Sequence, residues 1–264
     1  MSRRPNAELG DRDRQILELV GLTGVAGSQQ IERWVFADRS STALSTARRS
    51  RRVLARLHRD GYLLRLDRRL GGVRAGSSGW LYQLSTRGKR VIGIGGRGRT
   101  WEPGARFVDH ALAVLELHVQ MVEAERSGEL TDLRVAHEPA IWRRFTTASG
   151  PETLKPDLLV ELTTADGWDM RWFVEIDRGT EHLPTVLAKC QLYERYWRSG
   201  HEAAIHEVFP RVCWSVPSEK RAAAISRAIR RASGLTDDLF RIAVVEETPA
   251  LLVNTNHNSK GGQP

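Results

Sequence analysis

Two apolar segments on either side of a short turn constrain the fold of this 264-residue chain most strongly. Residues 155–161 and 172–177 are rich in Leu, Val, Ile, Phe and Trp, which favour strands, and residues 165–167 between them read Ala-Asp-Gly. A three-residue loop with its glycine in the left-handed conformation pairs Thr164 with Trp168. The sequence therefore predicts an antiparallel hairpin with a defined register.

This register decides whether the acidic residues of the hairpin meet. Counting along the two strands places Asp157 opposite Glu175, with Asp177 and Glu161 on the same sheet face, because side chains alternate between faces. A two-residue Asp-Gly loop would instead separate Asp157 from Glu175, and we expect the three-residue loop. Carboxylates on one face repel unless a cation lies between them, and oxygen ligands suit Mg²⁺ or Mn²⁺. The competing interpretation is a solvated strand face without a metal.

A helix follows the hairpin and carries a lysine toward the acids. Pro184 fits its first turn. Its apolar stripe, spaced by four, three and four residues, consists of Val186, Cys190, Tyr193 and Trp197. Lys189 and Tyr196, seven residues apart, line one edge of this stripe. We therefore expect Lys189 to approach the acids.

Positive charge is concentrated in the N-terminal part of the chain. Residues 1–106 hold 22 Lys and Arg against 9 Asp and Glu, a net charge of +13, whereas residues 107–264 hold 18 against 23, a net charge of −5. This asymmetry indicates that the N-terminal part meets a polyanion. Arginine supplies most of the charge, so genome composition is the alternative explanation.

The same part carries the pattern of a winged helix-turn-helix. Capping residues and apolar spacing predict three helices and two strands, at residues 11–21, from 28 onward, 41–60, 62–66 and 80–84. Three helices followed by a two-stranded wing place the third helix in the major groove of DNA. We expect Leu44, Ala47, Leu54 and Leu57 of this helix to face inward.

Double-stranded DNA is therefore the expected partner of the N-terminal part. The candidate contacts on the third helix and the wing loop are Thr46, Arg48, Arg49, Arg52, Arg56, Arg59, Arg68, Arg69 and Arg74. For any one of these arginines, a position on a solvated helix face is a sufficient explanation. It does not explain the whole set. DNA binding should weaken with salt.

The remaining sequence predicts a second, α/β domain. The expected order after residue 106 is a helix, three strands, the Lys189 helix, a strand, a basic helix at 218–232 and a last strand. We expect a winged-helix domain at 1–95, a linker at 96–106, the α/β domain at 107–253 and a disordered tail at 254–264. Accessory site candidates are His110, Glu138, Gln191 and Tyr196.

Composition excludes several classes of protein. Two cysteines are too few for a disulfide scaffold and point to the cytoplasm, and no apolar run approaches the roughly 20 residues that cross a bilayer. The N-terminus has no apolar segment behind its charges, so no signal peptide is expected. The oligomeric state does not follow from the sequence.

The acidic strands resemble those of the PD-(D/E)xK nuclease-like superfamily. Pro156-Asp157 and Glu175-Ile176-Asp177 match its pattern, although Asp177 stands where a lysine is usual. Some members carry that lysine on the following helix, so Lys189 looks like the migrated residue, and Gln191 with Tyr193 or Tyr196 resembles a related helix signature. The resemblance implies catalytic roles for Asp157, Glu175, Asp177 and Lys189, with Asp157 and Glu175 holding Mg²⁺ or Mn²⁺.

From about residue 11 to about 253 the chain resembles the replication-relaxation family of bacterial plasmids and other mobile elements. The features that carry the resemblance are the winged-helix pattern, the segment 109–112 that opens a helix, and Glu175-x-Asp177-x-Gly179-Thr180-Glu181 followed by Lys189. It implies a role in replication or transfer of mobile DNA, with other replication or transfer proteins as partners.

Three functions compete at this point. The first is a DNA-binding protein with Mg²⁺-dependent endonuclease or nickase activity, and the second is a DNA-binding scaffold or transcriptional regulator whose nuclease-like domain is inactive. The third, a relaxase that joins itself to DNA through a tyrosine, is the weakest, because no pair of histidines surrounds a hydrophobic residue. We rank DNA binding first.

Overall fold

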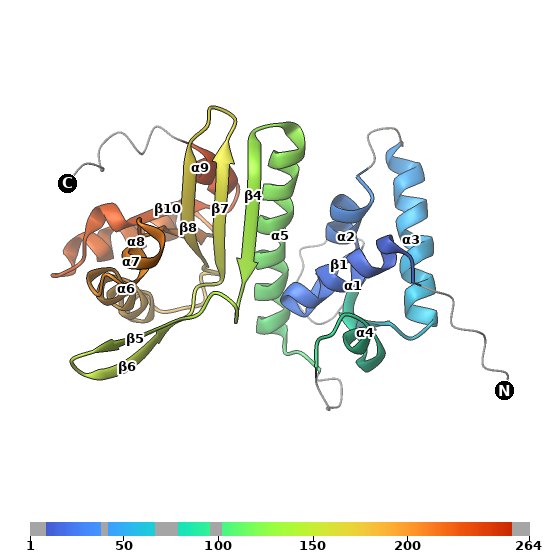
Figure 1. Ribbon diagram of the computed structural model, residues 1–264, viewed down its shortest axis with the longest axis horizontal. Coiled ribbons are helices and arrows are strands. Elements are labelled where there is room, and N and C mark those ends of the chain that lie inside the picture. Colours follow the sequence, from blue (N-terminus) through green and yellow to red (C-terminus); the bar gives the residue numbers. More distant parts are fainter. Residues whose placement is uncertain (1–8, 38–41, 67–78, 96–101, 255–264) are drawn as a thin grey trace. The chain divides into compact units, whose positions relative to one another are not determined.

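The structure is a computed structural model that describes residues 9–37, 42–66, 79–95 and 102–254 (Figure 1). The chain divides into two compact units, residues 1–119 and 120–264. This division falls inside α5 (Ala105–Ser127), the longest helix among the described residues. The linker predicted at 96–106 lies partly outside the described residues, and a flexible boundary there stays a prediction.

The first unit combines helices with a small antiparallel sheet, in the order predicted from the sequence. Its helices and strands are α1 (Asp11–Thr23), β1 (Val25–Gly27), α2 (Ser28–Val35), α3 (Ala43–Arg59), β2 (Leu63–Leu66), β3 (Leu81–Leu84), α4 (Thr86–Val91) and the first part of α5. The strands lie in the order β1-β3-β2. The short strand β1 was not predicted.

The core of this unit fixes the direction in which α3 points its side chains. Ile16 of α1, Leu54 and Leu57 of α3 and Leu115 of α5 are buried in one cluster. Leu44, predicted to face inward, is instead 73% exposed, because only the later turns of α3 contribute to this cluster. The face of α3 opposite the cluster is therefore open.

The second unit is built on a five-stranded mixed sheet. Its helices and strands are β4 (Leu130–His137), β5 (Arg143–Thr147), β6 (Gly150–Leu154), β7 (Leu158–Thr164), β8 (Asp169–Ile176), α6 (Leu183–Arg198), α7 (His201–His206), β9 (Arg211–Val216), α8 (Glu219–Arg231), η1 (Asp237–Leu239), β10 (Phe240–Val244) and α9 (Thr248–Val253), with the last part of α5. The strand order is β10-β9-β8-β7-β4, and β5 and β6 form a separate hairpin that was not predicted.

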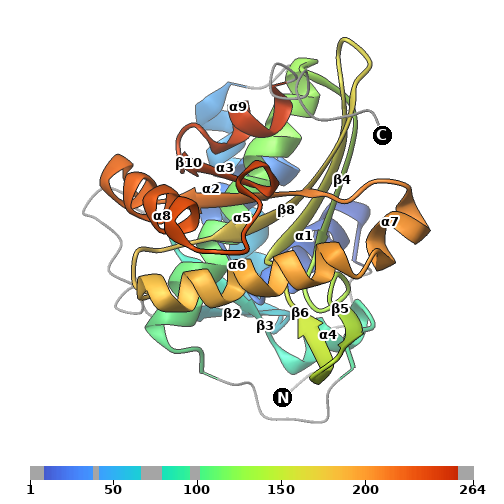
Figure 2. The same ribbon diagram turned by 90° about the vertical axis from the view of Figure 1, so that its left-hand side faces the viewer.

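Two helices cover one face of this sheet. Figure 2 shows α6 and α8 side by side across it. Val186 and Tyr193 of α6 and Ile225 of α8 are buried against Phe173 and Trp214 of the sheet. The sheet face that carries Glu175 is therefore closed by α6. Val186, Cys190 and Tyr193 of the predicted stripe are buried, whereas Trp197 is 40% exposed and Tyr196 is buried in its place.

The predicted register of the hairpin is confirmed. The Thr164 amide donates to the Trp168 carbonyl at 2.9 Å, and Gly167 has φ 87°, in the left-handed region. The antiparallel ladder then runs from Thr163 opposite Asp169 to Leu158 opposite Val174, in steps of one residue. This ladder sets Asp157, just before β7, opposite Glu175 of β8. No helix among the described residues is both long and apolar enough to cross a membrane.

Candidate functional site

Asp157, Glu175 and Lys189 converge at the end of β8, under α6. The Lys189 ammonium and the Tyr193 hydroxyl donate to the two different carboxylate oxygens of Glu175, the hydroxyl at 2.5 Å. Asp157 accepts a hydrogen bond from the Ile176 amide, with 2.7 Å between N and Oδ2. Two acids and one lysine that are far apart in sequence thus form one cluster, as the register and the helix periodicity predicted.

Burial dominates the electrostatics of this cluster. Glu175 is only 1% exposed, and its burial raises the pKa of its carboxyl to about 7, with a smaller contribution from Asp157. Lys189 opposes this shift. Its own pKa is raised above the usual value because Glu175 and Asp157 outweigh the effect of its burial, and the pKa of Tyr193 is raised mainly by burial. Burial therefore favours the protonated form of Glu175, while the hydrogen bonds from Lys189 and Tyr193 favour the carboxylate.

Asp177 lies outside this cluster, although it follows Glu175 by two residues. Its carboxylate accepts from Arg221 at the start of α8, at 2.6 Å and 3.3 Å, and from the Gly179 amide at 3.0 Å. This ion pair is buried, because the Asp177 side chain is fully covered and Arg221 is 15% exposed. Asp177 therefore anchors α8 to the end of β8, and no local sequence pattern identifies Arg221 as its partner.

The cluster offers two carboxylates, Asp157 and Glu175, as candidate ligands for one divalent cation. No group of three or more His, Cys, Asp or Glu that could hold a metal occurs in the part of the chain that the structure describes. Mg²⁺ is commonly held by one or two carboxylates, with waters and substrate phosphates as its other ligands. Each oxygen of Glu175 accepts one hydrogen bond and retains a second lone pair, so Asp157 and Glu175 can serve as such ligands.

The predicted accessory residues of the second unit do not join the cluster. Gln191 is on the exposed face of α6, and Glu138 is an exposed residue after β4 that accepts from the Trp142 ring nitrogen at 3.3 Å. Tyr196 donates to Glu202 at 2.5 Å. His110 belongs to the first unit and is half-buried in α5. Tyr193 binds Glu175 in place of Tyr196: the helix signature left the two tyrosines open, and the position of Tyr193 on an apolar stripe indicated packing.

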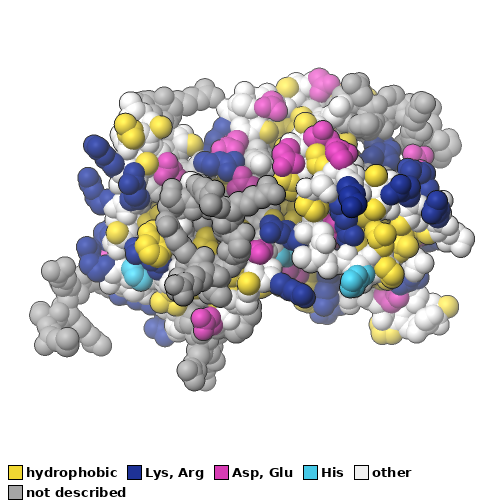
Figure 3. All heavy atoms as spheres, turned by 180° about the vertical axis from the view of Figure 1, so that it is seen from behind, with side chains coloured by type: hydrophobic (Ala, Val, Ile, Leu, Met, Phe, Trp, Pro, Cys, Tyr) yellow, Lys and Arg dark blue, Asp and Glu magenta, His cyan; other side chains and the backbone are white. Residues whose placement is uncertain are grey.

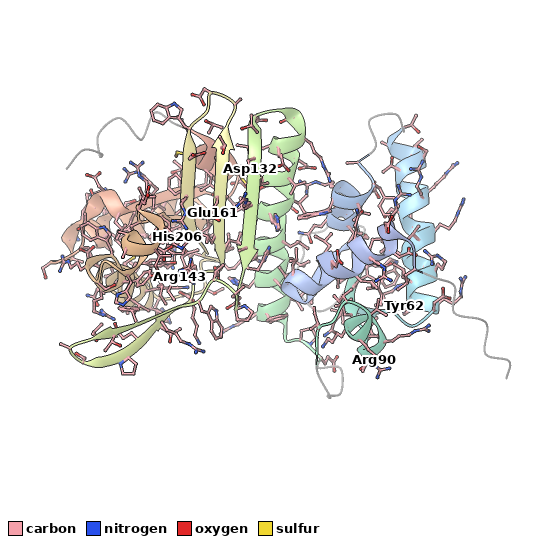
Figure 4. All side chains as sticks on the ribbon, in the orientation of Figure 1. Tyr62, Arg90, Asp132, Arg143, Glu161 and His206 are labelled. Carbon is pink, nitrogen blue, oxygen red and sulfur yellow. The ribbon has the colours of Figure 1, made fainter. Side chains whose placement is uncertain are left out.

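Glu202, the partner of Tyr196, is the centre of a second buried network. It is 1% exposed and accepts from Arg143 at 2.8 Å and 3.3 Å, and Arg171 lies at 3.5 Å. Figure 4 shows Arg143, from β5, near His206, from α7. The hydrogen bonds from Arg143 and Tyr196 lower the pKa of Glu202 even though its burial, the largest influence, acts in the opposite direction. Because the negative charge of Glu202 is balanced by Arg143 and Arg171, this network joins α7 to β5 and to β8 of the sheet.

In the first unit, α3 presents an exposed row of arginines. Arg48 and Arg52 are exposed, and among the described residues neither has a hydrogen bond or ion pair. Arg56 is instead paired with Asp13 of α1, and Arg59 contacts Asp60 at 3.2 Å. The four positions thus divide into two that are open to a ligand and two that have acidic neighbours.

The other predicted DNA contacts are less exposed or lie outside the described residues. Thr46 and Arg49 are half-buried on α3. Arg68, Arg69 and Arg74 all lie in the segment 67–78, outside the described residues. Their role in contacting DNA stays a prediction.

The fold and the cluster define a mixed α and β protein with a basic N-terminal unit and a sheet-based second unit. A model of the Replication-relaxation family matches residues 17–212. Because this match covers well over half of the chain, the chain belongs to the Replication-relaxation family, and membership suggests a role in plasmid replication. No curated protein and no solved structure matches it.

Proposed function

We propose that this protein binds duplex DNA during plasmid replication, with α3 in the major groove. The observation that carries the proposal is the pair of exposed arginines Arg48 and Arg52, one turn apart on the side of α3 that faces away from Leu54 and Leu57. Three helices and an antiparallel sheet in this order are the arrangement expected of a winged helix-turn-helix, whose third helix reads the major groove.

Several features of the unit support this role for α3. Arg56 binds Asp13 and so ties α3 to α1, which holds the exposed face in a fixed orientation. Thr42 caps the helix by accepting from the Ser45 amide, with 3.3 Å between the atoms. An arginine without an acidic partner keeps its donors for phosphates or guanine edges. Rigid support under an unpaired basic face is what groove binding requires.

The test compares DNA binding of the full chain with that of two double variants that lose the same charge. R48A/R52A should lower the slope of log affinity against log salt by about 1.8 if both arginines contact phosphates, or cost about 1–3 kcal/mol per lost base contact. R14A/R90A removes two exposed arginines from α1 and α4 and serves as the control. Equal losses in the two variants would refute the role of α3.

A second candidate function, Mg²⁺- or Mn²⁺-dependent cleavage of DNA, is favoured by the convergence of Asp157, Glu175 and Lys189. Asp157 and Glu175 would hold the cation, which when bound would neutralise charge at a phosphate and activate water. Lys189 already forms an ion pair with Glu175, and its side chain is 29% exposed, so it would lie next to a phosphate held at this cation. Tyr193 orients the Glu175 carboxylate from the buried side.

The cleavage test uses supercoiled, linear and single-stranded DNA with Mg²⁺ or Mn²⁺. The parent protein should nick or cut at least one form, and D157N should not, because it removes a charged ligand while retaining an oxygen for the Ile176 amide. E161Q is the matched control, since Glu161 lies on β7, four residues after Asp157, and pairs with Arg171 outside the cluster. If no form is cut and calorimetry finds no cation binding, the second unit acts as a scaffold.

A further inference from the structure

We propose that α8 forms a second DNA-contacting surface, which holds the phosphate backbone of duplex DNA against the second unit. This inference rests on the proposed DNA binding and extends it beyond α3. Its residues are Lys220, Arg227, Arg230 and Arg231, all of them exposed. We call them the α8 basic stripe.

Helical geometry turns this stripe away from the core. Ile225 and Ile229 of α8 are buried against the sheet. Arg227 and Arg231 each lie two positions after one of these isoleucines, which is roughly 200° around a helix of 3.6 residues per turn. Lys220 lies seven positions before Arg227 and so on the same side. Three of the four charges, Lys220, Arg227 and Arg231, therefore form a row roughly 16 Å long, at about 1.5 Å per residue.

The stripe differs from neighbouring basic residues in having no acidic partner. Arg221 binds Asp177, and Arg195 and Arg198 of α6 bind Glu152 and Glu194. By contrast, no hydrogen bond or ion pair reaches the side chains of the stripe from any residue that the structure describes. Unpaired basic side chains in a row remain available to a polyanion, whereas paired ones are already neutralised.

Neither composition nor the helix dipole accounts for this arrangement. Residues 107–264 carry a net charge of −5, and Figure 3 shows Lys and Arg side chains mixed with Asp and Glu over the face it displays. Basic residues in a last turn, such as Arg230 and Arg231, interact favourably with the dipole. Lys220 is in the first turn, where a cation is unfavourable. A local row of basic residues in an otherwise acidic part of the chain is therefore suited to bind an anion from outside the protein.

The position of α8 links the stripe to the acidic cluster. Lys220 is adjacent in sequence to Arg221, which binds Asp177 at the end of β8, and Glu175 lies two residues earlier on that strand. The first turn of α8, which carries Lys220, is thus anchored beside the end of the strand that carries Glu175. DNA held along α8 would have its backbone close to this end of β8.

The test is the salt dependence of duplex DNA binding by the full chain. R227A/R231A should lower the slope of log affinity against log salt by about 1.8, for two lost phosphate contacts. The matched control, R134A/R144A, removes two exposed arginines from β4 and β5 and should leave the slope close to that of the parent. Thermal unfolding of each variant separates lost contacts from lost structure.

The outcomes distinguish failure of the inference about α8 from failure of the proposed function. If R48A/R52A weakens binding while R227A/R231A behaves like the parent, the inference about α8 is overturned and the proposed function stands. Equal losses in R227A/R231A and R134A/R144A also overturn it, because net charge alone would then explain them. If the parent protein binds no duplex DNA at low salt, the proposed function fails and the role of α8 fails with it.

Discussion

Replacing Glu175 with glutamine should flatten the dependence of stability on pH between about pH 5 and pH 8. Burial raises the pKa of Glu175 from its usual 4.5 to about 7. A carboxyl whose pKa is higher in the folded state contributes stability below its unfolded pKa and loses it as the pH rises through the folded pKa. The parent protein should therefore become less stable as Glu175 ionises, and E175Q should not.

The size of this effect follows from the difference between the two pKa values. A rise from 4.5 to about 7 corresponds to about 3 kcal/mol, at about 1.4 kcal/mol per pKa unit, and most of this loss falls between pH 5 and pH 8. Lys189 adds no pH dependence in this range, because its raised pKa keeps it charged throughout. Glutamine has nearly the same shape as glutamate and can still bond to Lys189 and Tyr193.

The assay is urea unfolding of the parent, E175Q and a control at pH 5, 6, 7 and 8. The control is E152Q, because the hydrogen bond from Arg195 lowers the pKa of Glu152, so that this group titrates below the tested range. E152Q should lose stability with rising pH as the parent does. If E175Q shows the same decline as the parent, burial does not raise the Glu175 pKa and the argument from burial is refuted.

Three further changes test other parts of the fold by urea unfolding or calorimetry. Lys189→Met should cost about 3 kcal/mol of unfolding free energy at pH 8, because it leaves the buried Glu175 carboxylate without its cation. The loss should be smaller at pH 5, where that carboxyl is protonated, and equal losses at the two pH values would contradict this expectation. Arg143→Met should cost about 2 kcal/mol through Glu202. Gly88→Ala should cost about 2 kcal/mol, because the new Cβ would lie 2.3 Å from the Tyr62 carbonyl oxygen, and an unchanged melting temperature would refute this.

The hairpin shows what local sequence can determine by itself. Its register depends on the turn, in which Gly167 adopts a positive φ, and on the strict alternation of side chains along each strand. These are properties of residues close in sequence, so the placement of Asp157 opposite Glu175 could be predicted. The approach of Lys189 followed in the same way from the period of a helix that has one apolar face.

Ion pairs between elements could be decided only by the tertiary structure. Arg221 and Asp177 are 44 residues apart, and Arg56 and Asp13 are 43 apart, so no local pattern identifies them as partners. Chemically similar arginines therefore have different roles: Arg56 is paired, and Arg48 on the same helix is exposed. A periodic sequence tells which side of a helix is polar, but packing decides which of its charges acquire a partner and which remain available to DNA.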